Sequence, residues 1–227
     1  MHPYLVVKHS KRARRLGLRL DPADRVIRLT VPRGVSLRRA QDFVEDHKDW
    51  IEEKIATLPP LVPFEHGKTI PLLGRDRLID ISPPIKGSRT KIELSDDMLR
   101  METLLENPSP RIEKFIKAFA LDQLTSLSRE KSAQIGKTVR SVKVRDTKSR
   151  WGSCAHDGGL SYSWRLIFAP RLAFDYVVAH EIAHLAHLNH GKEFWALCRD
   201  LSEDFMEGEY WMRNHGHELM RYGSRES

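Results

Sequence analysis

Four histidines lie within eleven residues of this chain, in the segment DYVVAHEIAHLAHLNHG at positions 175–191. Two of them, His180 and His184, frame the pattern H-E-x-x-H. Residues four apart in a helix lie one above the other on the same face. Two imidazoles at this spacing can bind one tetrahedral zinc ion. The segment therefore predicts a helix that carries two metal ligands.

Glu181 stands between these two histidines. It lies too far round the helix to bind the same ion, and it is placed instead to accept a proton from a water molecule at the metal. The flanking residues, 176–179 and 182–183, are mostly apolar or small. A buried His or Glu side chain is costly unless it has a partner. A bound metal would supply that partner, so we expect Glu181 to be catalytic.

The third ligand has two candidates, His187 and His190. In a continuing helix His187 lies on the ligand face but roughly 7.5 Å along the axis from the first pair, which is too far for comfortable binding. His190 can reach the ion if the chain reverses after His187, and Asn189 and Gly191 suit a reversal. The spacing of His180, His184 and His190 also equals that of the metzincin motif, which has Gly where His187 stands. We therefore favour His190.

The bulk composition is that of a globular protein without a membrane segment. The chain has 227 residues, of which 40% are hydrophobic and 30% charged. It has no apolar run of membrane-spanning length and no apolar region of a signal peptide. Its two cysteines, Cys154 and Cys198, do not form a disulfide framework. We expect a cytoplasmic protein with no membrane partner.

Hydrophobic periodicity predicts an α+β fold in two parts. The first part, residues 1–107, reads as a β-rich N-terminal module with one helix. Its expected elements are hairpins at 16–20 with 27–31 and at 70–73 with 78–81, a strand at 91–94 and a helix at 37–58. Residues 106–110, ENPSP, give the boundary. The second part, residues 108–227, is expected to hold a long helix from 112 to about 136, a strand–turn–strand unit, the H-E-x-x-H helix from about Pro170, and helices at 192–201 and 209–220.

The positive charge is concentrated near the N-terminus. Residues 1–39 contain eleven basic side chains against two acidic ones, a net charge of +9, so the rest of the chain carries −2 of the total +7. This bias is typical of proteins with an anionic partner, and nucleic acid binding through the basic residues 8–39 is one hypothesis. An arginine-rich solvent face of a small sheet explains the bias equally well.

Several segments together resemble the YgjP-like metal-dependent hydrolases, small bacterial zincins related to the SprT and WLM zinc peptidases. The segments are SRWGSC at 149–154, SWRLIFAP at 163–170, DYVVAHEIAHL at 175–185 and NHGKEFW at 189–195, with KRARRLGLRL, VPRGVSLRRAQDFVEDHKDWI and LLGRDRLIDI nearer the N-terminus. The resemblance covers nearly the whole chain. It implies a minimal zincin-like C-terminal domain with Zn²⁺ at His180, His184 and His190 and a catalytic Glu181. One departure is Gly191, where the family often has Ser.

Other side chains are candidates for contact with the substrate. A zincin needs a group that stabilises the developing oxyanion, and Arg150, Arg165 and Tyr162 are the candidates. The two arginines would also suit a phosphate, and ion pairs that fix the local structure are the alternative for both. The expected strand at 160–166 could pair with an extended peptide. Cys154 is either a fourth metal ligand or, as we favour, a small buried residue.

Three hypotheses of function follow. The first is a zinc-dependent metallopeptidase that acts on a peptide or protein, with Glu181 as general base. The second keeps the metal site and changes the substrate to a nucleotide phosphoanhydride, which the basic N-terminal half and the arginines Arg150 and Arg165 suggest. The resemblance also implies it, because a nucleoside triphosphate pyrophosphatase activity has been attributed to the family. The third is a SprT-like protease that associates with nucleic acid through its basic N-terminal residues.

Overall fold

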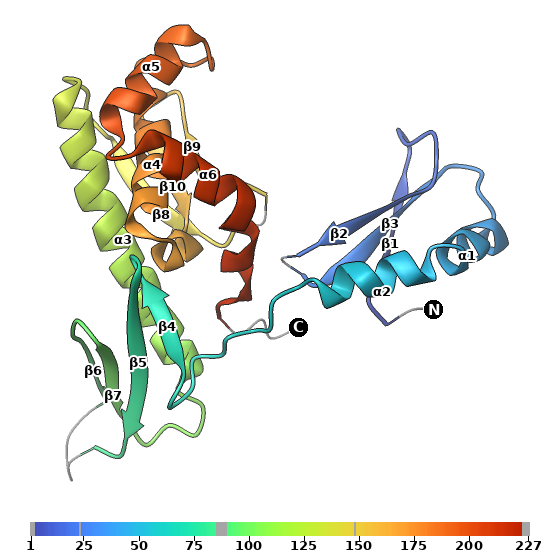
Figure 1. The fold of residues 1–227 in the computed structure, drawn as a ribbon, viewed down its shortest axis with the longest axis horizontal. Coiled ribbons are helices and arrows are strands. Elements are labelled where there is room, and N and C mark those ends of the chain that lie inside the picture. Colours follow the sequence, from blue (N-terminus) through green and yellow to red (C-terminus); the bar gives the residue numbers. More distant parts are fainter. Residues whose placement is uncertain (1–2, 23, 85–89, 148, 224–227) are drawn as a thin grey trace. The chain divides into compact units, whose positions relative to one another are not determined.

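Three small mixed sheets and six α-helices make up the described part of this computed structural model, which comprises residues 3–22, 24–84, 90–147 and 149–223 (Figure 1). The predicted α+β class is confirmed. The chain divides into two compact units, Met1–Pro60 and Leu61–Ser227. The boundary that we predicted between residues 107 and 108 lies inside the second unit. Whether it separates two domains stays a prediction. No helix in the described ranges is long and apolar enough to cross a membrane.

The first unit contains a three-stranded sheet of order β1-β3-β2. Strands β2 (Gly17–Asp21) and β3 (Val26–Pro32) form the predicted antiparallel hairpin, with Leu18 opposite Leu29. Strand β1 (Leu5–Ser10) adds in parallel to β3 and was not predicted, because only three apolar residues precede its charges. Alternate residues of β3 are buried, which directs one face of the sheet towards the helices.

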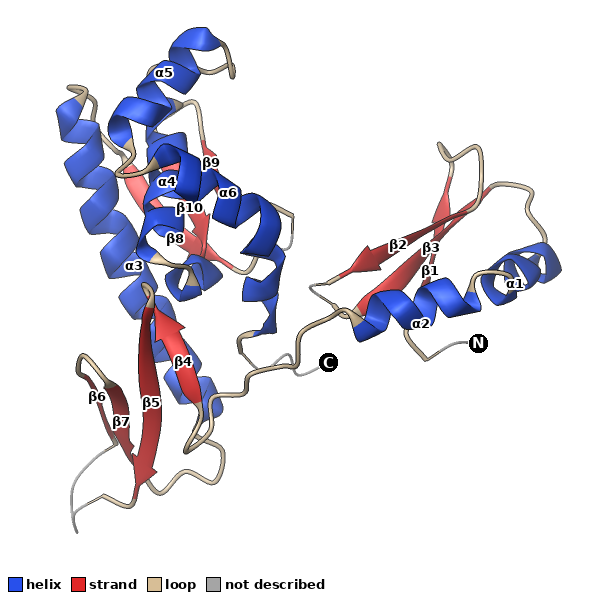
Figure 2. Cartoon of the chain, viewed as in Figure 1, coloured by secondary structure: helices blue, strands red, loops and turns tan. Residues whose placement is uncertain are grey.

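Two helices follow the sheet where we predicted one (Figure 2). Helix α1 (Leu37–Glu45) begins at Ser36, whose hydroxyl accepts the N–H of Arg39 as an N-cap. Helix α2 (Lys48–Ala56) begins at His47, whose ring nitrogen Nδ1 lies 2.8 Å from the carbonyl oxygen of Phe43. This side-chain contact with the last turn of α1 accompanies the break between the two helices. The prediction of a single helix over 37–58 is therefore wrong at its centre.

The second unit begins with a four-stranded sheet of order β4-β5-β7-β6. The predicted hairpin and the predicted strand at 91–94 are present, and β7 was missed. The strands are β4 (Thr69–Leu72), β5 (Arg75–Ser82), β6 (Lys91–Leu94) and β7 (Met98–Glu102).

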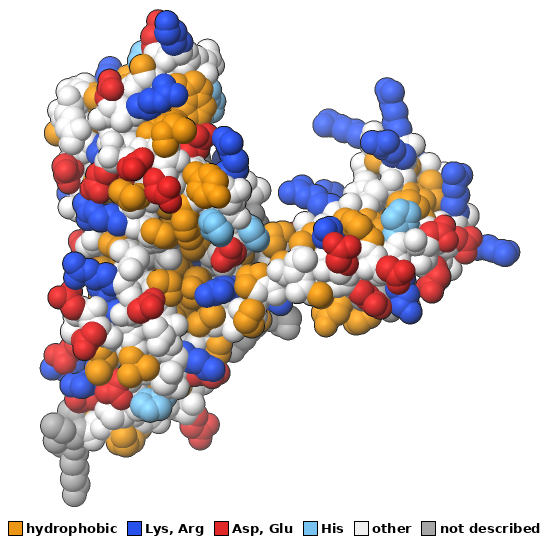
Figure 3. Space-filling model, viewed as in Figure 1, with side chains coloured by type: hydrophobic (Ala, Val, Ile, Leu, Met, Phe, Trp, Pro, Cys, Tyr) orange, Lys and Arg blue, Asp and Glu red, His pale blue; other side chains and the backbone are white. Residues whose placement is uncertain are grey.

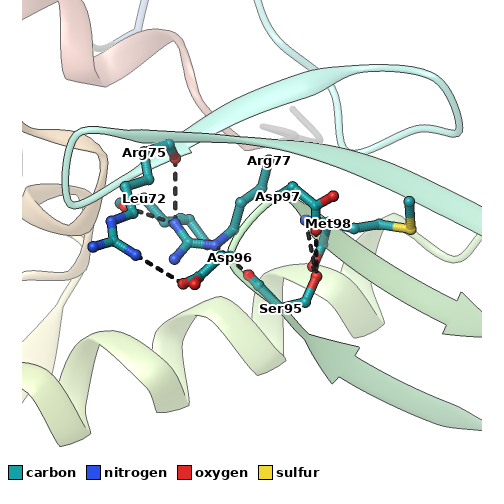
Figure 4. Close-up of polar contacts among 7 residues, drawn as sticks. All are labelled: Leu72, Arg75, Arg77, Ser95, Asp96, Asp97 and Met98. Atoms are coloured by element: carbon teal, nitrogen blue, oxygen red, sulfur yellow. Dashed lines mark hydrogen bonds and ion pairs between the residues drawn. The ribbon is translucent and has the colours of Figure 1, made fainter.

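The guanidinium of Arg77 connects the β4–β5 turn to the β6–β7 turn by hydrogen bonds (Figure 4). It donates to the carbonyl oxygens of Leu72 and Ser95 at 2.7 and 2.8 Å. Burial lowers the pKa of Arg77, and the nearby charge of Asp96 raises it in part. Asp96 itself pairs with Arg75 at 2.8 Å on the exposed side of the same turns. We assign this cluster to the stability of the sheet, because its hydrogen bonds join backbone groups of the two turns.

The remainder of the second unit is helical around a third sheet of order β8-β10-β9. The predicted long helix, the H-E-x-x-H helix and the helix at 192–201 are present. The last predicted helix begins earlier and ends earlier than expected. The expected strand at 160–166 ends at Ser163 and continues as a 3₁₀ turn. The elements are α3 (Ser109–Gln134), β8 (Ser141–Arg145), β9 (Gly152–Cys154), β10 (Gly159–Ser163), η1 (Trp164–Phe168), α4 (Arg171–Ala183), α5 (Lys192–Leu201), α6 (Phe205–His215) and η2 (Gly216–Arg221).

Helix α4 lies at the centre of this half of the molecule, between α3, α5 and α6 (Figure 1). It crosses α6 closely at Gly208, where an added Cβ would lie 2.6 Å from both the carbonyl oxygen of Leu172 and the Cβ of Tyr176. A buried ion pair joins it to α3, because Lys131 Nζ lies 2.6 Å from Asp175 Oδ1. These contacts fix the helix that carries the first histidine.

Candidate metal centre

The chain leaves helix α4 earlier than we predicted. The helix begins after Pro170 and ends at Ala183, and His184 is already its C-cap. The reversal that we expected after His187 therefore starts three residues sooner. Neither Asn189 nor Gly191 adopts a left-handed conformation, since Gly191 has φ −77° and ψ −176° and begins α5 as its N-cap. The chain therefore turns without a residue in the left-handed conformation at position 187, where the metzincin motif has a glycine.

This turn brings three imidazoles together. His180, His184 and His190 each offer a ring nitrogen, and these atoms all lie within 4.8 Å of one another. The Nε2 atoms of His180 and His190 are 3.1 Å apart. Zinc–nitrogen bonds of about 2.0–2.1 Å in a tetrahedral arrangement place two donor nitrogens roughly 3.3 Å apart. The three side chains could therefore hold one metal ion, and a tetrahedral ion bound by them would keep one position for water or substrate.

A backbone carbonyl orients the second histidine. His184 Nδ1 lies 3.1 Å from the carbonyl oxygen of His187, and as the donor it leaves Nε2 free to bind a metal. His187 thus contributes its main chain, while its own ring is outside the cluster of three. We expected His187 to be a partly exposed helix residue near the site. It is partly exposed, but it lies in the turn after the helix.

The protonation states also suit a metal. Burial, and to a smaller extent the neighbouring rings of His184 and His190, lowers the pKa of His180 to about 4. The pKa of His184 is also lowered, chiefly by burial. Both rings are therefore neutral near pH 7 and keep a lone pair for a ligand bond.

Two aromatic side chains of α5 pack against the three imidazoles. The ring of Phe194 lies 4.6–5.0 Å from each histidine ring, centroid to centroid. The ring of Trp195 lies 5.8 Å from His180 and 5.5 Å from His190. This wall restricts the rotation of the rings and gives them an apolar neighbour on one side. Sequence reasoning missed it, although the segment KEFW directly follows the third histidine.

The carboxylate of Glu181 is buried beside the cluster. Its residue is only 5% exposed, and burial raises its pKa to about 7 while the charge of Arg150 opposes the increase. Gly152 of β9 leaves room for it. An added Cβ at Gly152 would lie 2.6 Å from Cγ and 2.7 Å from Cδ of Glu181. The glycine of the segment SRWGSC therefore has a specific steric role that sequence reasoning missed.

A pocket of ≈ 360 Å³ opens onto His180 and Glu181. Strand β9 and the residues before it line one side, including the exposed Arg150. Helix α4 contributes Tyr176, one turn before His180, with ring centroids 6.1 Å apart. Burial raises the pKa of Tyr176 to about 12, so its hydroxyl stays protonated. The sequence could have indicated Tyr176, because it is four residues before His180 and so lies on the same face of the helix.

Two of our three substrate-contact candidates lie elsewhere. Tyr162 is fully buried, and its hydroxyl hydrogen-bonds to Ser128 at 3.1 Å. Burial raises the pKa of Tyr162 well above its usual range. Arg165 is 1% exposed, pairs with Asp146 and donates to the carbonyl oxygen of Tyr222. Both side chains are buried and hydrogen-bonded in the interior, and of the three candidates only Arg150 lines the pocket.

The proposed strand addition also needs a correction. Strand β10 pairs with β8 on one edge and β9 on the other, so it has no edge for a peptide. Cys154 at the end of β9 is half-buried and lies outside the cluster of potential ligands. Burial and the charges of Glu181 and Asp157 raise the pKa of its thiol to about 11. The thiol is protonated near neutral pH, as expected for a packing residue.

Comparison with known proteins places the chain in a family. A family model described as YgjP-like, metallopeptidase domain, matches residues 14–215, which includes the three histidines, Glu181 and Gly152. The chain belongs to the YgjP-like family. The family resemblance inferred from the sequence is confirmed. No curated protein and no solved structure matches the chain.

Proposed function

We propose that this YgjP-like protein is a zinc-dependent peptidase with His180, His184 and His190 as metal ligands. The proposal depends on one observation: the ring nitrogens of three histidines converge, and one of them, His180, lines a pocket together with the buried carboxylate of Glu181. Zinc held by these three residues would supply a water molecule of lowered pKa and a Lewis acid for the substrate carbonyl. In this proposal, residues 108–227, which contain α4, form a minimal zincin-like domain.

Glu181 acts as the general base in this proposal. Its carboxylate accepts a proton from the attacking water and then delivers it to the amine that leaves the cleaved peptide bond. The pocket side is open to substrate, while Gly152 and the buried flank of α4 hold the carboxylate in place. Because the carboxylate is already held in one position, the reaction does not have to pay the entropic cost of ordering it.

Arg150 and Tyr176 are the groups that we assign to the oxyanion. Both line the pocket with His180 and Glu181. Arg150 supplies a fixed positive charge, and the protonated hydroxyl of Tyr176 supplies a neutral donor. The two candidates come from different segments, the residues before β9 and helix α4, and single substitutions test each of them separately.

The edge of β9 suits an extended substrate. In the order β8-β10-β9, strand β9 pairs only with β10 within the described residues, so its other edge is available for hydrogen bonds to a peptide backbone. Gly152 belongs to this strand and contacts Glu181. A peptide paired with β9 passes next to the catalytic carboxylate.

The test is turnover by a Glu181→Gln variant with its zinc content measured in parallel. The substrates are casein and a panel of fluorogenic peptides. Glutamine has nearly the same shape but cannot accept the proton, so kcat should fall by about 10³-fold or more with one zinc per chain retained. Glu207→Gln, an exposed carboxylate on α6, is the matched control. Peptide hydrolysis at the parent rate in Glu181→Gln would refute the proposal.

A nucleotide phosphoanhydride is the second candidate substrate, because two guanidinium groups line the same pocket. They belong to Arg150 and Arg213, and Arg213 also pairs with Glu209 at 2.7 Å. Arginine binds phosphate oxygens in a bidentate manner. Release of pyrophosphate from nucleoside triphosphates, with no cleavage of casein or peptides, would favour this candidate. Nucleic acid binding through residues 8–39 and a cytoplasmic location stay predictions.

A further inference from the structure

Strand β1 has a free edge that resembles the receiving edge in strand-addition complexes. It pairs with β3 over all six residues in regular register, and no strand pairs with its other side in the part of the chain that the structure describes. It contains neither a proline nor a bulge, and its Val6 and Val7 are each 40% exposed. Unpaired backbone groups along such an edge accept another extended chain.

An apolar groove runs beside this edge, between β1 and α1. Leu5, Val7 and His9 of β1 face the helix side, because they pair in register with the buried residues of β3. Helix α1 buries fully only Ala40, which leaves a cavity of ≈ 480 Å³ between the helix and the strands. We call this cavity the β1–α1 groove, and its apolar lining includes Leu5, Val7, Leu29, Val31, Leu37 and Val44.

Leu37 shows that the groove is accessible. Its side chain is 70% exposed at the first turn of α1, yet it lines the cavity. A large leucine in that position contributes little to the interior of the unit. It is available to a partner whose side chain enters the groove.

The opposite face of the same edge is basic. Register places Lys8 next to Thr30 and Val6 next to Arg28, so these side chains point away from the helices. Asp21 and Asp24 neutralise Arg28. The loop after β1 is rich in basic side chains, namely Lys11, Arg12, Arg14 and Arg15. Figure 3 shows Lys and Arg side chains projecting from the strand side of this unit, while Asp and Glu side chains gather over its helices.

We propose that the β1–α1 groove binds an extended polypeptide segment as an added strand on β1. Residues of an added strand alternate between the two faces of the sheet. The segment would place apolar side chains in the groove at every second position and acidic side chains beside Lys8 and the basic loop at the others. This binding site belongs to the first unit alone and does not depend on the metal centre.

The probe is the fluorescein-labelled peptide Glu-Val-Glu-Val-Glu-Val-Glu, and the readout is fluorescence anisotropy. The full chain carries Glu181→Gln so that the probe stays intact. Two control peptides test the mechanism. One has the same composition in blocks, Val-Val-Val-Glu-Glu-Glu-Glu, and the other has alternate backbone nitrogens methylated, which removes the hydrogen bonds of strand pairing. We expect saturable binding of the alternating probe below about 1 mM, and binding of both controls at least about tenfold weaker.

Two variants and a matched control locate the site. Leu37→Glu puts a charge in the groove without a folding cost, because Leu37 is exposed, and it should weaken binding by about tenfold or more. Lys8→Glu should weaken it by about threefold and reduce its salt dependence. Leu104→Glu alters a leucine of the second unit that is 81% exposed and should change affinity less than about twofold. Circular dichroism checks that each variant is folded.

Three outcomes would overturn the proposal. The first is no saturable binding of the alternating probe below about 1 mM. The second is equal binding of the block or methylated peptide. The third is a concentration-dependent dimer in sedimentation that Leu37→Glu dissociates, because a second copy of the chain would then occupy the groove.

Discussion

Gly152 leaves open the space that the carboxylate of Glu181 fills. A methyl group at Gly152 would lie 2.6 Å from Cγ of Glu181, well inside contact distance. Position 152 therefore controls the position of the proposed base through its lack of a side chain. The two residues are 29 positions apart in the sequence, on β9 and α4. Gly152 is a positioning residue in this account.

The first prediction is that Gly152→Ala lowers kcat by about 10²-fold, the loss expected from displacing a catalytic group by about 1 Å. Zinc content should stay at the parent level, because the three histidines are unaffected. Gly191→Ala is the matched control, since a Cβ there meets nothing within 4 Å and Gly191 lies next to His190. Peptide turnover and elemental analysis make the measurement. A Gly152→Ala enzyme with parent kcat would contradict the steric role.

The second prediction concerns the buried pair that holds α4. Lys131 Nζ lies 2.6 Å from Asp175 Oδ1 and donates to the carbonyl oxygen of Leu201 at 2.5 Å. Asp175 Oδ2 accepts the N–H of Glu203. Lys131→Met leaves a buried carboxylate without its partner, so the free energy of unfolding should fall by about 3–5 kcal/mol. Urea denaturation gives the value.

An exposed ion pair provides the comparison for that experiment. Asp96 pairs with Arg75 at the turns of the first sheet of the second unit, where both side chains are exposed (Figure 4). Asp96→Asn should leave the urea midpoint almost unchanged, because solvent screens the pair. Equal losses of stability in Lys131→Met and Asp96→Asn would show that burial does not determine how much each ion pair contributes to the free energy of unfolding.

The third prediction separates two tyrosines. Tyr176→Phe removes a hydroxyl from the pocket and should lower kcat by about 10- to 100-fold with little change in KM. Tyr162→Phe removes a hydroxyl that bonds to Ser128 in the core, so it should cost about 1 kcal/mol of stability and leave kcat unchanged. Steady-state kinetics with thermal unfolding distinguishes the two effects. A loss of activity confined to Tyr162→Phe would reverse the assignment.

The sequence was most informative where chemistry and helical spacing coincide. His180 and His184 come together because they are four residues apart at the end of one helix, with His184 as its C-cap, and the place of Glu181 follows from the same helical geometry. Long periodic helices such as α3 and α5 were predicted nearly to their ends. In each case local periodicity carries the information.

Contacts between distant segments were not predictable in this way. The roles of Gly152 and Phe194 depend on which elements pack against α4, and the burial of Tyr162 and Arg165 depends on tertiary structure. Strand β1 was missed because an edge strand with exposed, mixed residues lacks clear alternation. The helix break at His47 is accompanied by a side-chain contact with the carbonyl oxygen of Phe43, which hydrophobic spacing does not encode.

The fourth prediction is that His180, His184 and His190 together bind one zinc ion. The measurement is the zinc content of the purified chain by elemental analysis, beside His184→Ala and His190→Ala variants and a His187→Ala control. We predict about one zinc per chain in the parent and the control, and a large loss of zinc in both ligand variants. Equal zinc in His190→Ala and the parent, or no zinc in the parent after incubation with zinc salt, would contradict it.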